Sequence, residues 1–164
     1  MRQLSRHFST VLVVLFLSIA LSACGFHLRG QLPLPESVNV IYVDAEPSDF
    51  TNDLKNSLRS SGAQLVDSPA QAKAILQIAD EFAERQVLTL NTDSRATAYT
   101  LFYSVKFLVA NNEQELLKEG ILKEQRNYSL DPGQATLQEN QERELLEEMY
   151  KELALKMVRQ IGAL

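Results

Sequence analysis

The sequence predicts an α+β domain in which a mixed four-stranded sheet packs against two helices. Three observations support this fold class. A β-branched strand, an amphipathic helix and a second strand follow one another over residues 37–90, an order that favours a parallel pair with a right-handed crossover. Residues 96–110 alternate between apolar and polar positions, as half-buried antiparallel strands do. An apolar stripe at helical spacing runs along residues 136–161.

The first strand is expected at residues 37–43. Its apolar run over residues 40–43 is unbroken, which predicts burial on both faces. Ser48 or Asp49 can cap the helix that follows, and Gly62 suits the left-handed position that ends it. The apolar positions of this helix share one stripe: Phe50, Leu54 and Leu58.

The remaining strands form a meander. A short apolar patch at residues 65–66 can form a small edge strand before the long strand at residues 74–90. The polar turn at residues 92–95 predicts a hairpin, and the returning strand runs to Ala110. Its inward positions are Tyr99, Leu101, Tyr103, Val105, Phe107 and Val109. A fourth strand is expected at residues 116–128.

The last helix is expected at residues 136–161. Its apolar stripe comprises Leu146, Met149, Tyr150, Leu153, Met157 and Ile161. Acidic residues come early in this helix, and Lys156 and Arg159 come late. Because the amino end of a helix is electropositive and its carboxyl end electronegative, this distribution stabilises the helix.

Composition excludes several classes of function. The chain has 164 residues, 45% of them hydrophobic, which is enough for one domain with one core. A net charge of −5 makes it a poor general binder of nucleic acid, so an anionic ligand requires a local basic cluster. The single cysteine excludes an internal disulfide and a zinc site built from several thiolates.

The amino-terminal segment is typical of a secretory signal peptide. Arg2 and Arg6 precede an uncharged apolar run over residues 8–22, which is shorter than the ~20 apolar residues of a spanning helix. Leu-Ser-Ala-Cys, ending at Cys24, resembles the lipobox of bacterial lipoproteins. We therefore expect a signal peptide at residues 1–23, a lipidated tether at 24–36 and one folded domain at 37–164.

Motifs at both ends of the mature chain carry a second resemblance. Cys-Gly-Phe-His-Leu-Arg over residues 24–29, Arg126 followed by Asp131-Pro132, and the late helical Glu148-Met149-Tyr150 resemble the LptE family of lipopolysaccharide (LPS)-assembly lipoproteins. The resemblance implies a two-helix, four-strand sandwich that is not an enzyme. It also implies a plug inside the LptD outer-membrane β-barrel, which the lipoprotein helps to fold, and binding of LPS.

The resemblance also implies a membrane location. Cys24 would carry an S-diacylglycerol and an N-acyl chain, with no other cofactor. Stable anchoring takes two membrane signals, so three chains would hold the protein firmly. Gly25 in place of aspartate after the cysteine favours the outer membrane among Gram-negative lipoproteins.

The residues themselves indicate no active site and no metal site. The mature chain has a single histidine, His27, in the tether, where groups are poorly positioned for catalysis. Asp80 with Glu81, and Glu147 with Glu148, are expected to be solvated surface charges.

Basic residues on the sheet are candidates for binding LPS phosphates: Arg85, Arg95, Lys123 and Arg126, with Lys106 nearby. Arginine binds phosphate with two hydrogen bonds, and the hairpin can bring Arg85 beside Arg95. The alternative is ordinary cross-strand pairing with Glu84 or Glu124. The LptE family places another basic residue before the last helix, where this chain has Gln138.

Partner contacts are predicted at Phe26, His27 and Phe102, because Phe102 lies on the more polar side of its strand. The other strand aromatics are expected in the core. Two interpretations remain: a subunit of the LPS translocon, or a stand-alone periplasm-facing lipoprotein that binds an amphiphilic ligand.

Overall fold

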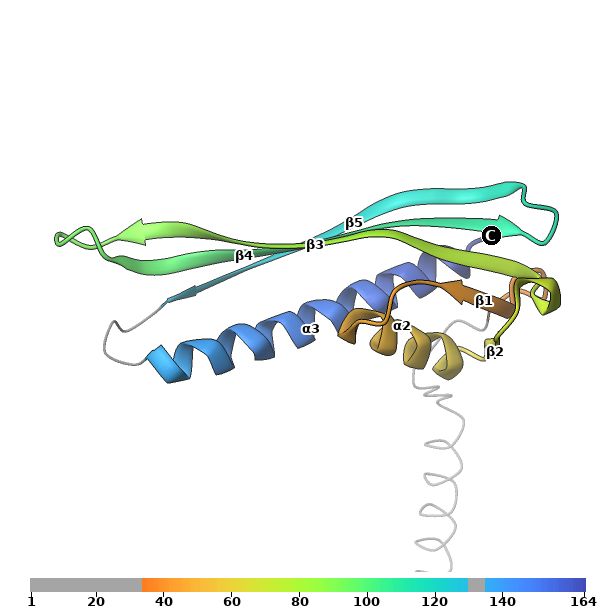
Figure 1. The fold of residues 1–164 in the computed structure, drawn as a ribbon, viewed down its shortest axis with the longest axis horizontal. Helices are drawn as coiled ribbons and strands as arrows, with labels where there is room; N and C mark the ends of the chain where they lie inside the picture. The colour runs from red at the N-terminus through yellow and green to blue at the C-terminus, as the bar shows by residue number, and fades with distance from the viewer. Residues whose placement is uncertain (1–33, 130–134) are drawn as a thin grey trace, which may run out of the picture. The chain divides into compact units, whose positions relative to one another are not determined.

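A five-stranded sheet with both helices on one face forms the folded domain (Figure 1). The computed structural model describes residues 34–129 and 135–164. The strand order is β2-β1-β3-β4-β5, and α2 (Asp49–Ser60) and α3 (Ala135–Ile161) lie side by side beneath the sheet. The α+β class with two helices is confirmed, together with the mixed sheet. The prediction of four strands is wrong.

The additional strand is β2 (Gln64–Val66), the short patch noted as a possible edge strand. It pairs in parallel with β1 (Val40–Asp44), placing Ile41 opposite Leu65. Three residues are too few to show a two-residue period, so only the pairing with β1 defines this strand. A short 3-10 helix, η1 (Pro69–Gln71), separates β2 from the next strand.

The first crossover has the predicted parallel geometry. β1 also pairs in parallel with β3 (Ala74–Leu90), and α2 connects the two strands. β1 begins three residues later than predicted, and only Ile41 within it is buried. Burial on both faces was therefore a wrong expectation, because the helices cover one face of the sheet and leave the other open.

The two hairpins follow the predicted boundaries closely. β3 pairs antiparallel with β4 (Ala96–Asn111), and β4 pairs antiparallel with β5 (Leu116–Ser129). The alternation in β4 is confirmed: Leu101, Tyr103, Val105, Phe107 and Val109 are all buried toward the helices. The outer part of the β3–β4 hairpin, which we define as the arm (residues 84–102), runs past the start of α3 to the tip of the hairpin (Figure 1).

Local sequence explains how α2 begins and ends. The Ser48 hydroxyl accepts a hydrogen bond from the Thr51 amide at 3.0 Å, which is the predicted amino-terminal cap. Gly62 has φ +85°, where a Cβ would strain the backbone. Leu34 is also buried, so the core includes a residue from the segment predicted to be a tether.

Aromatic rings join the three elements at the centre of the core. Tyr103 on β4 lies 5.9 Å from Phe50 on α2 and 4.7 Å from Tyr150 on α3, measured between ring centroids. On β5, a Cβ added to Gly120 would lie only 3.0 Å from the Phe107 ring. A glycine at this position therefore leaves room for the buried Phe107 ring.

The two halves of α3 differ in burial. The carboxyl-terminal half supplies Met149, Leu153, Ala154, Met157, Val158 and Ile161 to the core. Between residues 139 and 148, no side chain is buried, and Leu145 and Leu146 are only partly covered. The second half of α3 therefore provides most of the packing that holds the helix to the sheet.

This asymmetry can be tested on the helix itself. Leu153→Ala removes a fully buried side chain and should lower the free energy of unfolding by about 2–5 kcal/mol. Leu155→Ala alters a side chain that is 43% exposed and should change the free energy of unfolding by about 0.5 kcal/mol or less. Urea unfolding followed by circular dichroism measures both. Equal losses would contradict the placement of this helix.

Candidate ligand and partner surfaces

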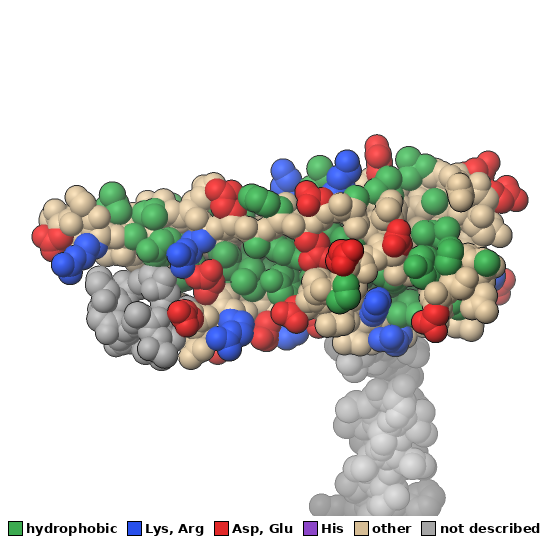
Figure 2. All heavy atoms as spheres, viewed as in Figure 1, with side chains coloured by type: hydrophobic (Ala, Val, Ile, Leu, Met, Phe, Trp, Pro, Cys, Tyr) green, Lys and Arg blue, Asp and Glu red, His purple; other side chains and the backbone are tan. Residues whose placement is uncertain are grey.

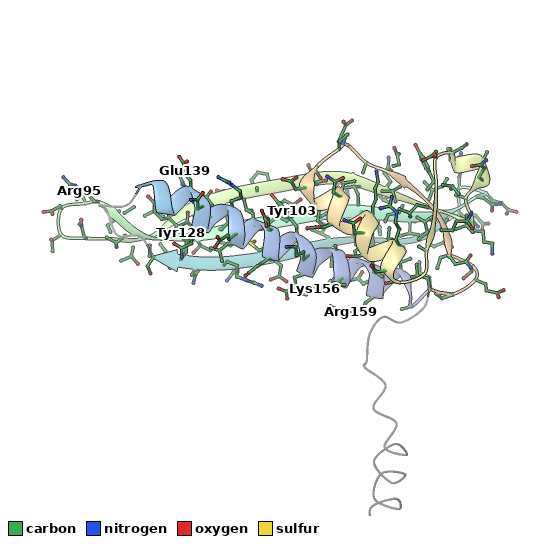
Figure 3. All side chains as sticks on the ribbon, turned by 90° about the horizontal axis from the view of Figure 1, so that it is seen from below. Arg95, Tyr103, Tyr128, Glu139, Lys156 and Arg159 are labelled. Carbon is green, nitrogen blue, oxygen red and sulfur yellow. The ribbon has the colours of Figure 1, made fainter. Side chains whose placement is uncertain are left out.

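The four basic candidates do not form one patch. Arg85 on β3 and Arg126 on β5 both lie opposite Leu101, so they share one row on the helix-covered face. Lys123 lies opposite Ser104 and points from the open face. Arg95 lies in the turn of the arm, opposite Asn91, about 20 Å along the strand from Arg85 at ~3.4 Å per residue. Figure 3 shows Arg95 at the tip, far from Lys156.

Arg85 is paired with the last helix. Its Nη1 donates to the Glu142 carboxylate at 3.0 Å, and its guanidinium lies 5.0 Å from the centroid of the Tyr99 ring. The Tyr128 hydroxyl donates to the same carboxylate at 2.9 Å. Burial, followed by this hydrogen bond, raises the pKa of Tyr128 to about 12, although Arg85 opposes the change. The carboxylate that pairs with Arg85 lies 57 residues away in sequence.

Arg126 belongs to an ion cluster between β5 and α3. It donates to Glu124 at 2.8 Å and to Glu152, while Lys156 donates to Glu124 and lies 3.3 Å from Glu152. Burial alone would raise the pKa of Glu124, but the hydrogen bonds from Lys156 and Arg126 outweigh it and lower the pKa. The predicted alternative named the right carboxylate for Arg126, but Glu124 lies two residues away on the same strand, so the pair is not the expected cross-strand one.

Arg95 and Lys123 are the more accessible basic candidates. Both are exposed, and neither forms an ion pair within the part of the chain that the structure describes. Between Arg85 and the turn that holds Arg95, the arm carries three aliphatic side chains that are more than half exposed: Val87, Leu88 and Leu90. The arm therefore combines a guanidinium with apolar surface. Elsewhere, acidic and basic side chains are interspersed along the side shown in Figure 2.

Glu81 is a half-buried polar contact that the sequence analysis missed. Its carboxylate accepts hydrogen bonds from Tyr103 at 2.7 Å, Ser48 at 3.0 Å and Thr51 at 3.3 Å. Burial, followed by the hydrogen bond to Glu81, raises the pKa of Tyr103. The expectation of a solvated charge holds for the exposed Asp80 and is wrong for Glu81. A register shift between Ile78 and Asp80 alters the alternation of β3 just before this residue.

The open face of the sheet mixes apolar and charged side chains. Phe102 lies on it, between Glu84 and Gln125 in neighbouring strands. Phe82 is 53% exposed, and Ile121 is 58% exposed. Near the opposite end from the arm, a shallow depression of about 340 Å³ is lined by Asp44, Ile75, Gln77, Leu108, Ala110, Gln114 and Leu116.

Several predicted residues lie outside the described part of the chain: Cys24, Phe26 and His27, as well as the side chain of Gln138. Within residues 34–129 and 135–164, no group of three or more His, Cys, Asp or Glu residues could hold a metal ion. Over the same residues, no helix combines the length and apolarity that crossing a membrane requires.

The ion cluster predicts a dependence of stability on pH. Because folding lowers the pKa of Glu124, its ionised form stabilises the native state above the unfolded pKa of about 4.5, and this contribution is lost as pH falls through the folded value. Glu124→Gln should flatten the loss of stability below this pH. Thermal unfolding across the acidic range measures the effect, with the exposed Glu119→Gln as control. Parallel profiles for wild type and Glu124→Gln would refute the assignment.

Comparison with solved structures supports the fold. The chain is similar to uncharacterized lipoprotein B from Nitrosomonas europaea, at 24% identity and TM-score 0.72, covering 85% of this chain and 91% of that one. It is also similar to rare lipoprotein B from Shewanella oneidensis, at 23% identity and TM-score 0.68, covering 76% and 95%. A minor lipoprotein from Acinetobacter baumannii matches at 24% identity and TM-score 0.65, covering 80% and 94%.

The family assignment rests on a sequence match that extends across the domain. Residues 36–161 match the family described as LptE, lipopolysaccharide-assembly. The match spans both helices and all five strands, from before β1 to the last residue of α3. The chain therefore belongs to the LptE family, whose members are non-enzymatic lipoproteins of LPS assembly.

Proposed function

We propose that this protein is the lipoprotein subunit of the LPS translocon, plugging an LptD-like outer-membrane β-barrel as a heterodimer and helping that barrel to assemble. The observation that carries the proposal is the open sheet face. Its rows alternate charged, polar and apolar side chains, such as Phe82–Ser104–Lys123 and Glu84–Phe102–Gln125. The interior of a wide outer-membrane barrel is polar, so a mixed surface suits it better than a continuous apolar one.

The proposal assigns LPS binding first to the arm tip. LPS carries phosphates and acyl chains, and the arm presents Arg95 at its turn and the exposed aliphatic residues Val87, Leu88 and Leu90 along the strand that leads to it. Guanidinium groups form charge-assisted hydrogen bonds with phosphate. Lys123 offers a second exposed charge on the open face. Arg85 and Arg126 contribute only if their bonds to carboxylates are exchanged.

A second candidate function is a stand-alone periplasm-facing lipoprotein that binds an amphiphile. The depression on the open face supports it, because Ile75, Leu108 and Leu116 line it with apolar surface while Asp44 and Gln77 are polar. The domain interior offers less room, since core side chains such as Leu54, Phe107 and Leu153 are fully buried. We therefore rank this function second.

Site-specific photo-crosslinking in cells tests the main proposal. A photoreactive residue at Phe102 should give an adduct with an outer-membrane β-barrel protein, and one at Arg95 should give an adduct with LPS. Thr51 is a matched control, because its buried side chain lies between α2 and the sheet and should crosslink to neither. Adducts of neither kind at Phe102 and Arg95, in a chain that folds normally, would overturn the proposal.

The anchor has its own test. We expect the mature protein to begin at Cys24, with an S-diacylglycerol and an N-acyl chain, and to fractionate with the outer membrane. Mass spectrometry of the amino-terminal peptide should find the mass of three acyl chains on this residue. An unmodified thiol at the mature amino end would remove the proposed membrane attachment and, with it, the delivery of this subunit to a membrane barrel.

A further inference from the structure

Arg85 has neighbours of two different kinds. One is the Glu142 carboxylate at 3.0 Å, bonded through Nη1. The other is the Tyr99 ring, which is stacked on Tyr128 with 5.6 Å between their centroids. The Arg85 side chain is 44% exposed, so solvent and ligands can reach it. Because the Tyr99 ring attracts the guanidinium independently of Glu142, Arg85 can keep its position when the carboxylate leaves.

The helix segment that carries Glu142 is weakly attached. No side chain between residues 139 and 148 is buried, and Leu145 and Leu146 give only partial cover. Glu142 bonds both Arg85 and Tyr128, so one carboxylate supplies two polar links between this half of α3 and the strands. Segments with few buried contacts open at low free energy. Loss of the Arg85 bond should therefore loosen this half of the helix.

We propose that Arg85 is an exchangeable phosphate-binding residue: the phosphate of an anionic lipid displaces Glu142 from Arg85 and loosens the first half of α3 from the arm. A phosphate monoester carries about −1.5 to −2 charges and three acceptor oxygens, so it competes well with one carboxylate for a guanidinium. The identification of the ligand as a phosphorylated lipid rests on the proposed function, and the exchange itself rests on the geometry at Arg85.

Arg126 provides a contrast within the same row. It is bonded to Glu124 and Glu152, and Lys156 bonds both of these carboxylates. A ligand that binds Arg126 would therefore have to displace both Glu124 and Glu152, although Lys156 also bonds these two carboxylates. Its neighbouring part of α3 is the buried half, which includes Leu153 and Met157. We therefore expect exchange at Arg85 and not at Arg126, which makes Glu152→Gln a matched control for Glu142→Gln.

The experiment uses the full-length protein in detergent, titrated with lipid A in micelles, with dephosphorylated lipid A in micelles and with inorganic pyrophosphate. Binding is measured by calorimetry, and opening is measured by amide hydrogen exchange of residues 139–148 against 149–161. Lipid A should speed exchange only in residues 139–148. Glu142→Gln should bind lipid A about two- to fivefold more tightly, the range expected when a competing exposed ion pair is removed.

The controls separate this proposal from the proposed function. Arg85→Ala should abolish the effect of lipid A on hydrogen exchange in residues 139–148. The double variant Arg85→Ala/Glu142→Gln should not recover this effect. An equal response to pyrophosphate would support phosphate recognition without a need for the lipid part. Lipid A could bind without faster hydrogen exchange in residues 139–148 and without tighter binding by Glu142→Gln. That result would refute the displacement of Glu142 from Arg85, while LPS binding would stand. If wild type and Glu142→Gln both fail to bind lipid A, the exchange and LPS binding are refuted together.

Discussion

The rest of the domain depends on the burial of one face of β4 beneath the second half of α3. β4 is paired on both sides, by β3 and β5, so its inward side chains form the middle row of the layer interface. Tyr103, Phe107 and Leu153 meet there with almost no exposed surface. This burial supplies the apolar free energy that a domain of this size needs. The arm beyond it, like the first half of α3, is then held mainly by polar contacts.

Those polar contacts engage two of the four basic candidates, while Arg95, Lys123 and the nearby Lys106 stay exposed. Acidic side chains of α3 face the basic side chains of β3 and β5, so Arg85 and Arg126 are engaged within the domain. Exposed ion pairs contribute little to stability and exchange partners readily, whereas the partly buried Glu124 is bonded on two sides. Ion pairs between α3 and the sheet thus differ along the helix. The cluster around Glu124 holds the second half of α3 firmly, whereas the exposed Arg85–Glu142 pair can be exchanged.

For a member of the LptE family, this division has a functional meaning. The packed part of the domain carries an open sheet face with Phe102 and Lys123, which is the face that the proposed function assigns to the barrel. The arm presents Arg95 and exposed aliphatic side chains at a distance from the packed core. A protein that binds without catalysis requires such surfaces, and it does not require the cluster of titratable groups that an active site needs. The Glu81 contacts with Ser48, Thr51 and Tyr103 tie the base of the arm to α2.

The sequence by itself determined the features that repeat locally or depend on one residue: the alternation of β4, the stripe of α3, the Ser48 cap and the Gly62 terminus. It also contained the motifs that indicate the family. Only the tertiary structure decided that β2 joins the sheet, that β1 is covered on one face, and that Glu81 is half-buried and hydrogen-bonded to α2 and β4. Glu142 as the partner of Arg85 and Glu152 as the partner of Arg126 belong to this second group, because they lie 57 and 26 residues away. The spacing of apolar residues along a strand or helix indicates which way each side chain points. An ion pair between distant residues forms only when their segments pack together in the folded domain.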